Sequence, residues 1–154
     1  MIITQSNGKK IYHYKQCGLD SVYLLNGFSE HQTEYGQAVS FKNVKELHKA
    51  ISLFIIRQES KLSGKEFRFL RKELELTQEQ LAKYLGFSVL EINRWEDEKN
   101  KLNPACDRLI RLLYIEHSLG NPHVLQLMQD LQETHANNNT IRLQLKKDGW
   151  QNAA

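Results

Sequence analysis

The chain has 154 residues, of which 40% are hydrophobic, with a net charge of +3 and a sequence pI of about 8.8. This length allows one compact domain or two small ones, and the mild positive charge permits binding to a polyanion without requiring it. The longest apolar run, "ISLFII", is far shorter than the roughly 20 residues that span a bilayer, and the first ten residues lack the pattern of a signal peptide. We therefore expect a cytoplasmic protein that does not bind a membrane.

Residues 1–42 alternate apolar and polar side chains in short runs, "KIYHYKQ", "SVYLLNGF" and "YGQAVSF". Turn residues separate these runs, at Gly18, Asn26, Gly27 and Gly36. The pattern predicts three or four short strands in a small antiparallel sheet. From Phe41 to about Gln58 the apolar spacing becomes helical. The side of this helix that we expect to be buried carries Val44, Leu47, Ile51, Phe54 and Ile55. Because a small sheet is marginal alone, we expect the helix to pack on it and form a β-rich module over residues 1–60.

A polar break, "SKLSG" at Ser60–Gly64, precedes five segments of helical pattern. We place the domain boundary there, with a helical domain over residues 61–118 and a C-terminal helix and tail over residues 119–154. Ser63 and Glu66 have the spacing of a capping box, and Gly86 suits a left-handed helix end. Further helix starts are indicated by Thr77, Ser88 and Pro104. The positions that we expect in the core are Phe67, Leu70, Leu74, Leu81, Leu85, Leu109, Leu112 and Leu113. The predicted fold class is α+β.

The last helical segment, "NPHVLQLMQDLQETH", is amphipathic through Val124, Leu127, Met128 and Leu131. A single domain would not obviously require this apolar stripe for its own packing, so we expect the stripe to form the contact of a homodimer. The tail that follows contains a polar spacer, one predicted strand at Thr140–Leu145 and a lone tryptophan, Trp150.

Thr77–Glu96, "TQEQLAKYLGFSVLEINRWE", has the pattern of two short helices joined by a tight turn. Counted from Gln78, the fifth residue is small where the helices cross, the ninth is a glycine, and the fifteenth and eighteenth are apolar. These four positions are Ala82, Gly86, Ile92 and Trp95. If Ile92 and Trp95 face the core, Leu90, Asn93, Arg94 and Asp97 face outward.

An outward face of this composition is typical of a helix that lies in the DNA major groove, where arginine pairs with guanine, asparagine with adenine, and apolar groups touch thymine methyls. The predicted base contacts are Val89, Leu90, Asn93 and Arg94. The predicted phosphate contacts are Thr77, Gln78, Ser88, Lys99 and Lys101. Nearby carboxylates would weaken DNA binding, although we expect Glu96 to pair internally. The same spacing also occurs in helical bundles that bind nothing.

No catalytic or metal constellation competes with this interpretation. Cys17 and Cys106 are far apart without a CxxC pair, and the six histidines form no HxxxH or HExxH pair. There is no nucleophile with an evident base and no glycine-rich phosphate loop. We expect no enzyme activity, no catalytic residues, no bound metal and no cofactor.

The segment "LRKELELTQEQLAKYLGFSVLEINRWEDEKNKLNPACDRLIRLL" resembles the Xre/Cro-type repressor domain, over about Ser63–Tyr114. This resemblance implies a lambda-repressor-like domain of five helices that binds double-stranded DNA, at a palindromic operator, as a homodimer. The order of parts is similar to that of MqsA-type (YgiT-type) antitoxins, whose N-terminal module binds zinc through two CxxC pairs and masks a toxin. Of that zinc pattern the chain keeps only "QCG" at Gln16–Gly18.

The resulting hypothesis is a sequence-specific transcriptional repressor, more narrowly an antitoxin that represses its own operon and binds a cognate toxin protein. The alternative is a protein-interaction module in which the helical domain serves as a scaffold. Its anchors would be exposed aromatic side chains, at Tyr12, Tyr14, Tyr23 and Trp150.

Overall fold

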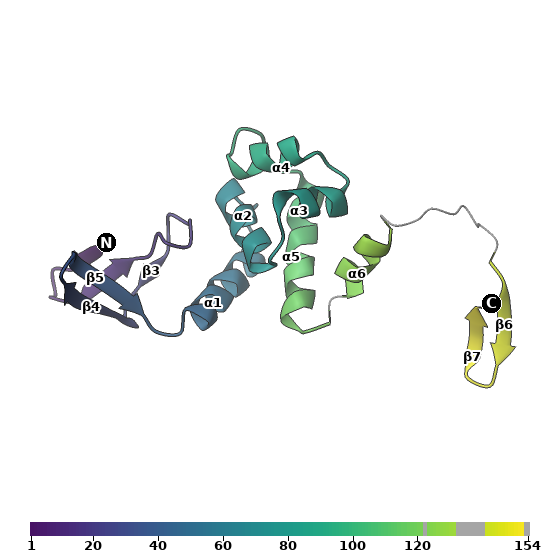
Figure 1. Cartoon of the computed structure of the whole chain (residues 1–154), viewed down its shortest axis with the longest axis horizontal. Coiled ribbons are helices and arrows are strands. Elements are labelled where there is room, and N and C mark those ends of the chain that lie inside the picture. The colour runs from purple at the N-terminus through teal and green to yellow at the C-terminus, as the bar shows by residue number, and fades with distance from the viewer. Residues whose placement is uncertain (122, 132–140, 153–154) are drawn as a thin grey trace.

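The computed structural model describes residues 1–121, 123–131 and 141–152, and has an N-terminal β-rich part followed by helices (Figure 1). The first five strands are β1 (Ile2–Thr4), β2 (Lys10–His13), β3 (Tyr23–Leu24), β4 (Phe28–Thr33) and β5 (Gly36–Phe41). They form two antiparallel sheets, one in the order β1-β2-β3 and one a β4-β5 hairpin. The predicted antiparallel strands are confirmed, but the single sheet is wrong, since two sheets form and neither β1 nor β4 was foreseen as a strand.

Aromatic side chains join the two sheets. The ring of Tyr12 on β2 lies 5.6 Å from that of Phe28 and 5.0 Å from that of Phe41, and the ring of Tyr14 lies 4.9 Å from Phe41. Tyr12 and Tyr14 are therefore buried, and the prediction that they are exposed anchors is wrong. Tyr23 at the sheet edge is exposed as predicted.

Helix α1 (Val44–Arg57) packs mainly on the next helix, α2 (Gly64–Glu73), and less on the sheets. Because α1 packs on α2, the side of α1 that is buried differs from the side that was predicted. Ile55 and Ile56 are buried together with Ser52, whose hydroxyl donates to the carbonyl of His48 at 2.9 Å. Phe54, expected in the core, is 75% exposed, and Val44 is exposed as well. Both expectations were wrong because helical spacing alone could not identify the packing partner.

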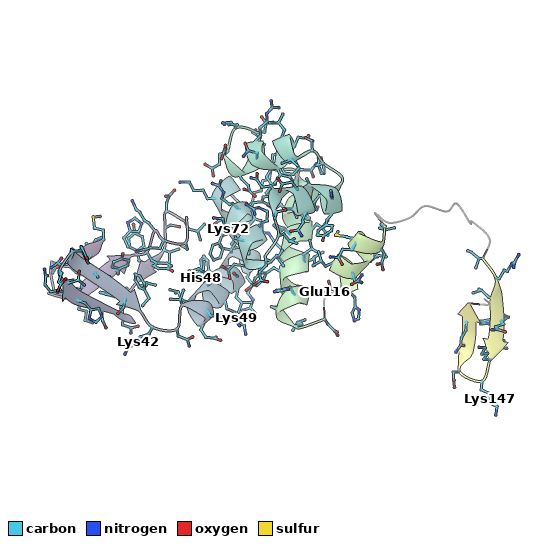
Figure 2. The ribbon with its side chains drawn as sticks, in the orientation of Figure 1. Lys42, His48, Lys49, Lys72, Glu116 and Lys147 are labelled. Atoms are coloured by element: carbon cyan, nitrogen blue, oxygen red, sulfur yellow. The ribbon has the colours of Figure 1, made fainter. Side chains whose placement is uncertain are left out.

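His48 on α1 connects the β-rich part to the helices (Figure 2). Its Nδ1 donates to the carboxylate of Glu73 on α2 at 2.9 Å, and its Nε2 lies 3.0 Å from the hydroxyl of Tyr14, at hydrogen-bonding distance. Burial raises the pKa of the Tyr14 hydroxyl, which therefore stays protonated and able to donate. This chain of hydrogen bonds joins three segments that are far apart in sequence.

The remaining described helices are α3 (Gln78–Leu85), α4 (Val89–Glu96), α5 (Pro104–Ser118) and α6 (His123–Asp130). The predicted helix starts are confirmed: α2, α3 and α4 each begin with a capping box, and α5 has Pro104 in its first turn behind the N-cap Asn103. In each capping box the N-cap hydroxyl accepts from a backbone N–H three residues on, and that residue's side chain accepts from the N-cap N–H.

The core lies between these helices. Its fully buried apolar side chains include Phe67, Leu70, Leu81, Ile92, Ile110 and Leu113. Leu19, from the segment before β3, belongs to the same buried cluster, so the N-terminal part contributes to this core. The division of the chain into units at residues 60 and 118 stays a prediction. Leu112 on α5 was expected to be buried but is 60% exposed, because its neighbour Leu113 takes the inward position.

The C-terminal part differs most from the prediction. The fifth predicted helix is α6, and its expected extension to His135 lies outside the described residues, as does Thr140. The predicted strand is present in part as β6 (Leu143–Lys146). It forms a hairpin with β7 (Gly149–Asn152), which was not predicted, and Leu145 lies opposite Trp150. Trp150 is 68% exposed, in agreement with the prediction.

The described helices do not include one with the length and apolarity needed to cross a bilayer. Within the same ranges, no three His, Cys, Asp or Glu side chains come together as a metal site would need. Cys17 is half-buried, with its Sγ donating to the carbonyl of Tyr14 at 3.5 Å, and Cys106 is buried in the helical core.

Candidate nucleic-acid interface

The pair α3 and α4 is held in place by its turn and by the small residue beneath it. Gly86 takes a φ of 72°, the left-handed region in which a glycine costs least, and the Phe87 N–H donates to the carbonyl of Ala82 at 3.0 Å. Ala82 itself is buried, which lets the two helices approach closely. The roles predicted for Ala82 and Gly86 are confirmed.

Two buried side chains fix the rotation of α4 about its axis. Ile92 is fully buried, and the buried Trp95 packs edge-on against Phe87 and Phe67, with ring centroids 4.9 Å and 6.1 Å apart. With these residues inward, Leu90 is 57% exposed, and Val89 and Arg94 are also exposed. Asn93 is half-buried at the edge of the same face. The four predicted base-contacting residues thus share the outer side of α4.

A buried ionic network ties α4 to α2. Glu96, whose side chain is fully buried, accepts from Arg71 at two places, Nε to Oε1 at 2.6 Å and Nη2 to Oε2 at 3.0 Å. Arg71 Nη1 also donates to the carbonyl of Leu76 at 2.7 Å. The guanidinium of Arg68 lies 3.3 Å from Glu96 as a second cation. The expectation that Glu96 pairs internally is confirmed, so this carboxylate is not directed toward the outer face.

Three of the predicted phosphate contacts already use their side chains within the domain. Gln78 Nε2 donates to Glu96 Oε2 at 2.8 Å. The Thr77 hydroxyl accepts from the Gln80 N–H at 3.1 Å, and the Ser88 hydroxyl accepts from the N–H of its capping-box partner at 3.2 Å. The N–H groups of Thr77 and Ser88 also donate within the capping boxes, at 2.9 Å and 3.3 Å, so a phosphate contact from either residue would replace a capping-box bond. Next to Thr77, hydrogen bonds from the Glu79 backbone N–H and the Thr77 hydroxyl lower the pKa of the Glu79 carboxyl.

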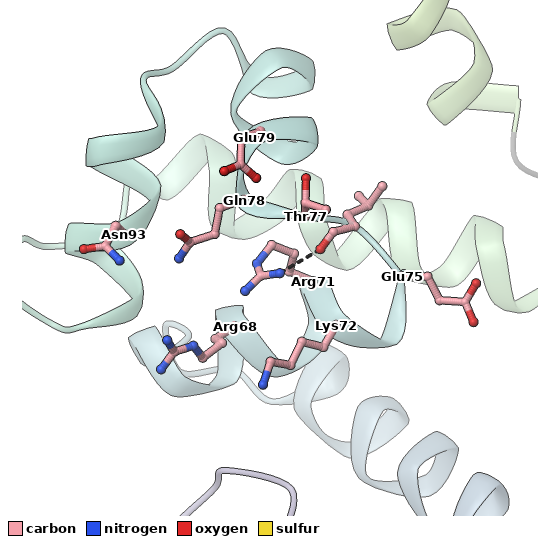
Figure 3. Close-up of a pocket in the computed structure, with 9 residues that line it drawn as sticks. Arg68, Arg71, Lys72, Glu75, Thr77, Gln78, Glu79 and Asn93 are labelled. Atoms are coloured by element: carbon pink, nitrogen blue, oxygen red, sulfur yellow. Dashed lines mark hydrogen bonds between the residues drawn. The ribbon is translucent and has the colours of Figure 1, made fainter.

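A shallow hollow of about 490 Å³ lies between α2 and the start of α3 (Figure 3). Two exposed cations on α2, Arg68 and Lys72, border it opposite Gln78 and Asn93. The sequence prediction missed both cations, although their spacing of four residues would have placed them on one side of a helix. Glu75 and Glu79 also border the hollow, so its charge is mixed.

The lysines predicted to contact phosphate follow the C-terminal end of α4. Lys99 and Lys101 border a second hollow, of about 470 Å³, together with Lys61 and Trp95. Lys99 Nζ lies 3.3 Å from Asp97 Oδ2, and both Lys99 and Lys101 are exposed. Lys61 precedes α2 in sequence, so the sequence pattern gave no reason to group it with the other two. Cations therefore border two hollows, one beside Asn93 and one beside Trp95.

Residues 67–111 match the helix-turn-helix family model. The match runs from α2 into α5 and contains the outward face of α4, the buried network and the lysines that follow α4. It supports a DNA-binding regulator of transcription with a lambda-repressor-like helical part, in agreement with the Xre/Cro resemblance. No curated protein and no solved structure matches the chain.

Proposed function

We propose that the protein is a sequence-specific repressor that binds a palindromic operator as a homodimer. We further propose that it is an antitoxin that represses its own operon and binds the co-encoded toxin. The observation that carries the proposal is the outer face of α4, where Leu90 and Arg94 are exposed on a helix held from behind by Ile92, Trp95 and Glu96.

Rigid support matters for base reading because a side chain must meet a base edge at hydrogen-bonding distance. In the proposed complex Arg94 donates two hydrogen bonds to a guanine and Asn93 pairs with an adenine. Val89 and Leu90, in the first turn of α4, contact thymine methyl groups. These contacts follow from the residue types on the exposed face, and they set the sequence preference.

Phosphate contacts position the helix in the groove. Lys99 and Lys101 suit the DNA backbone at the C-terminal end of α4, and Arg68 and Lys72 supply cations beside α3. Gln78 would add its backbone N–H at the start of α3, whereas Thr77 and Ser88 would reach a phosphate by exchanging their capping-box bonds. This arrangement is expected to make binding strongly dependent on salt.

A dimer is proposed because one recognition helix buries little surface, and two half-sites about one helical turn (roughly 34 Å) apart give the usual specific affinity. Val124 and Leu127 on α6 are exposed, while Met128 packs on the core. The exposed stripe therefore faces away from the helical core and suits a second copy of the chain.

The proposal that the protein is an antitoxin rests on the order of its modules. The β-rich part carries no helix of the DNA-reading kind, yet it is joined to the helical part through Tyr14, His48 and Glu73. A module placed in this way is suited to holding a second protein while the helices hold DNA.

The decisive experiment is a binding titration of the full chain against its own upstream DNA and a scrambled duplex, at two salt concentrations. Arg94→Ala is expected to lower specific affinity by about 1–3 kcal/mol while leaving binding to the scramble nearly unchanged. Arg57→Ala is the matched control, because Arg57 is also exposed but ends α1. Equal affinity for the two duplexes would refute the proposal that the protein is a sequence-specific repressor.

A second function, a protein-interaction module on a helical scaffold, is favoured by the C-terminal hairpin. Leu143, Leu145 and Trp150 are exposed, and strand alternation and pairing put them on one face. Two-stranded hairpins are marginal by themselves, so this apolar face favours contact with another surface. If deletion of residues 141–154 left every protein contact and DNA binding intact, this function would lose its support.

A further inference from the structure

A groove of about 220 Å³ lies where the N-terminal part meets the helices. Its walls are the segment before β3, the outer side of α1 and the start of α2. The apolar side chains that line it are Leu19, Val22, Ile51, Phe54 and Ile55. The volume is below the roughly 300–1,000 Å³ of small-molecule sites, so the groove has the size for a single side chain.

Phe54 is the main apolar group left uncovered at this groove. It lies in the last two turns of α1 and is 75% exposed, whereas Ile55 next to it is buried. Single exposed apolar side chains are common on protein surfaces, but Phe54 adjoins an apolar groove, and binding hot spots lie in pockets of that kind. Covering the Phe54 ring would remove a large apolar area from water.

The rim of the groove is acidic, although the whole chain has a net charge of +3. Three carboxylates border it, from Asp20, Glu66 and Glu98, against one ammonium group, from Lys65, which leaves two negative charges. Lys65 is paired with Asp20. Glu66 accepts from the Ser63 N–H at 2.8 Å in the capping box of α2. Glu98 is exposed, and its carboxylate accepts from the Gly64 N–H at 3.1 Å.

We propose that this groove binds a basic partner protein, which inserts one aliphatic or aromatic side chain beside Phe54 and places a neighbouring lysine or arginine at Glu98. The apolar lining selects the inserted side chain, and the acidic rim selects the positive charge. Charge complementarity with the acidic rim favours a partner that presents a positive charge beside the inserted side chain. The proposal deepens the proposed function, since it names the surface that would hold the partner protein.

The groove is in contact with the DNA-reading helix. A Cβ atom at Gly64 would lie 2.1 Å from the carbonyl oxygen of Trp95, so the start of α2 touches the end of α4 directly. Glu98, one turn beyond Trp95, holds the same glycine by its N–H. An occupant that pulls on Glu98 therefore acts on the end of α4, and partner and DNA binding should influence each other reciprocally.

The probe for the groove is a random-peptide phage library selected against the full chain, followed by titration of the synthetic consensus peptide. The expected consensus has an aliphatic or aromatic residue next to lysine or arginine. Phe54→Ser and Glu98→Gln should each weaken that peptide at least about tenfold, as a hot-spot contact would. Tyr35→Ser is the matched control, because Tyr35 is an aromatic residue of the β4–β5 turn that is even more exposed.

Failure to enrich such a consensus, or equal binding by Phe54→Ser and the unaltered chain, would overturn the proposal. So would sedimentation showing that Phe54→Ser alone abolishes self-association, because the occupant would then be a second copy. Peptide selection needs no DNA, so a failure of this proposal can be distinguished from a failure of the proposal that the protein is a repressor. Far-ultraviolet circular dichroism of both groove variants checks that they remain folded.

Discussion

Arg71 on α2 donates two hydrogen bonds to Glu96 at the end of α4, and both side chains are buried. The pair joins the helix that presents Arg94 to the helix that forms one side of the core. Because two charges are removed from water, their attraction mainly offsets their desolvation. The loss of one partner is the costly event, since it leaves the other charge buried and unpaired.

Glu96→Leu is therefore expected to lower the free energy of unfolding by about 3–5 kcal/mol, because it leaves Arg71 unpaired. The double variant with Arg71→Met should regain most of that loss. Arg68→Ala serves as the control, since this half-exposed cation should contribute no more than about 1 kcal/mol. Denaturant unfolding measures the free energy of unfolding of all three variants. A loss below about 1 kcal/mol for Glu96→Leu would contradict a stabilising role of the buried pair.

Lys99→Ala and Lys101→Ala are expected to weaken binding to operator and scrambled DNA alike. Each should reduce the slope of log affinity against log salt concentration by about 1. The reason is that each variant loses one phosphate contact, so one fewer counterion is released from the DNA on binding. Lys83→Ala provides a control, since this exposed lysine borders neither hollow beside α4. Fluorescence anisotropy over a salt series gives the slopes, and an unchanged slope for both variants would remove these lysines from the interface.

Leu127→Asp is expected to convert the dimer to a monomer, because it puts a charge in the exposed stripe of α6. Gln126→Asp adds the same group at the neighbouring position of the same helix and should leave the dimer intact. Sedimentation velocity at micromolar concentration distinguishes the two species. A monomeric unaltered chain, both free and on DNA, would rule out the dimer.

Both thiols should react slowly with thiol reagents at neutral pH. Burial raises the pKa of Cys17 and of Cys106 above the ordinary value, so little of either is the reactive thiolate. The unfolded chain loses these protons near the ordinary pKa of about 8.5, before the folded chain does, so these groups make stability fall as the pH rises above that value. Cys17→Ser and Cys106→Ala should each flatten this alkaline decline in denaturant unfolding. If stability fell equally steeply with pH in both variants, the alkaline decline would be due to groups other than these thiols.

Local sequence signals predicted the helical part well. The starts of α2, α3 and α4 and the left-handed Gly86 depend on residues within four positions of one another. The outward face of α4 followed from the inward positions of Ile92 and Trp95 by helical geometry alone. For these features the short-range pattern carries the necessary information.

Features that depend on packing partners were not predictable in the same way. Phe54 and Leu112 lie on stripes that helical spacing assigns to the core, and only the positions of the neighbouring helices show that they are exposed. Arg71 and Lys72 are adjacent basic residues in sequence. One is buried against Glu96 and the other lies at the edge of a hollow, a difference set by where α4 crosses α2.

The three successive capping boxes also bear on the speed of folding. Each one specifies where a helix begins with residues that are three positions apart, before any distant contact has formed. Chains dominated by local contacts of this kind fold in microseconds to milliseconds. These helix starts should therefore form early in folding, before the contacts of α2 with α5, which lie farther apart in the sequence.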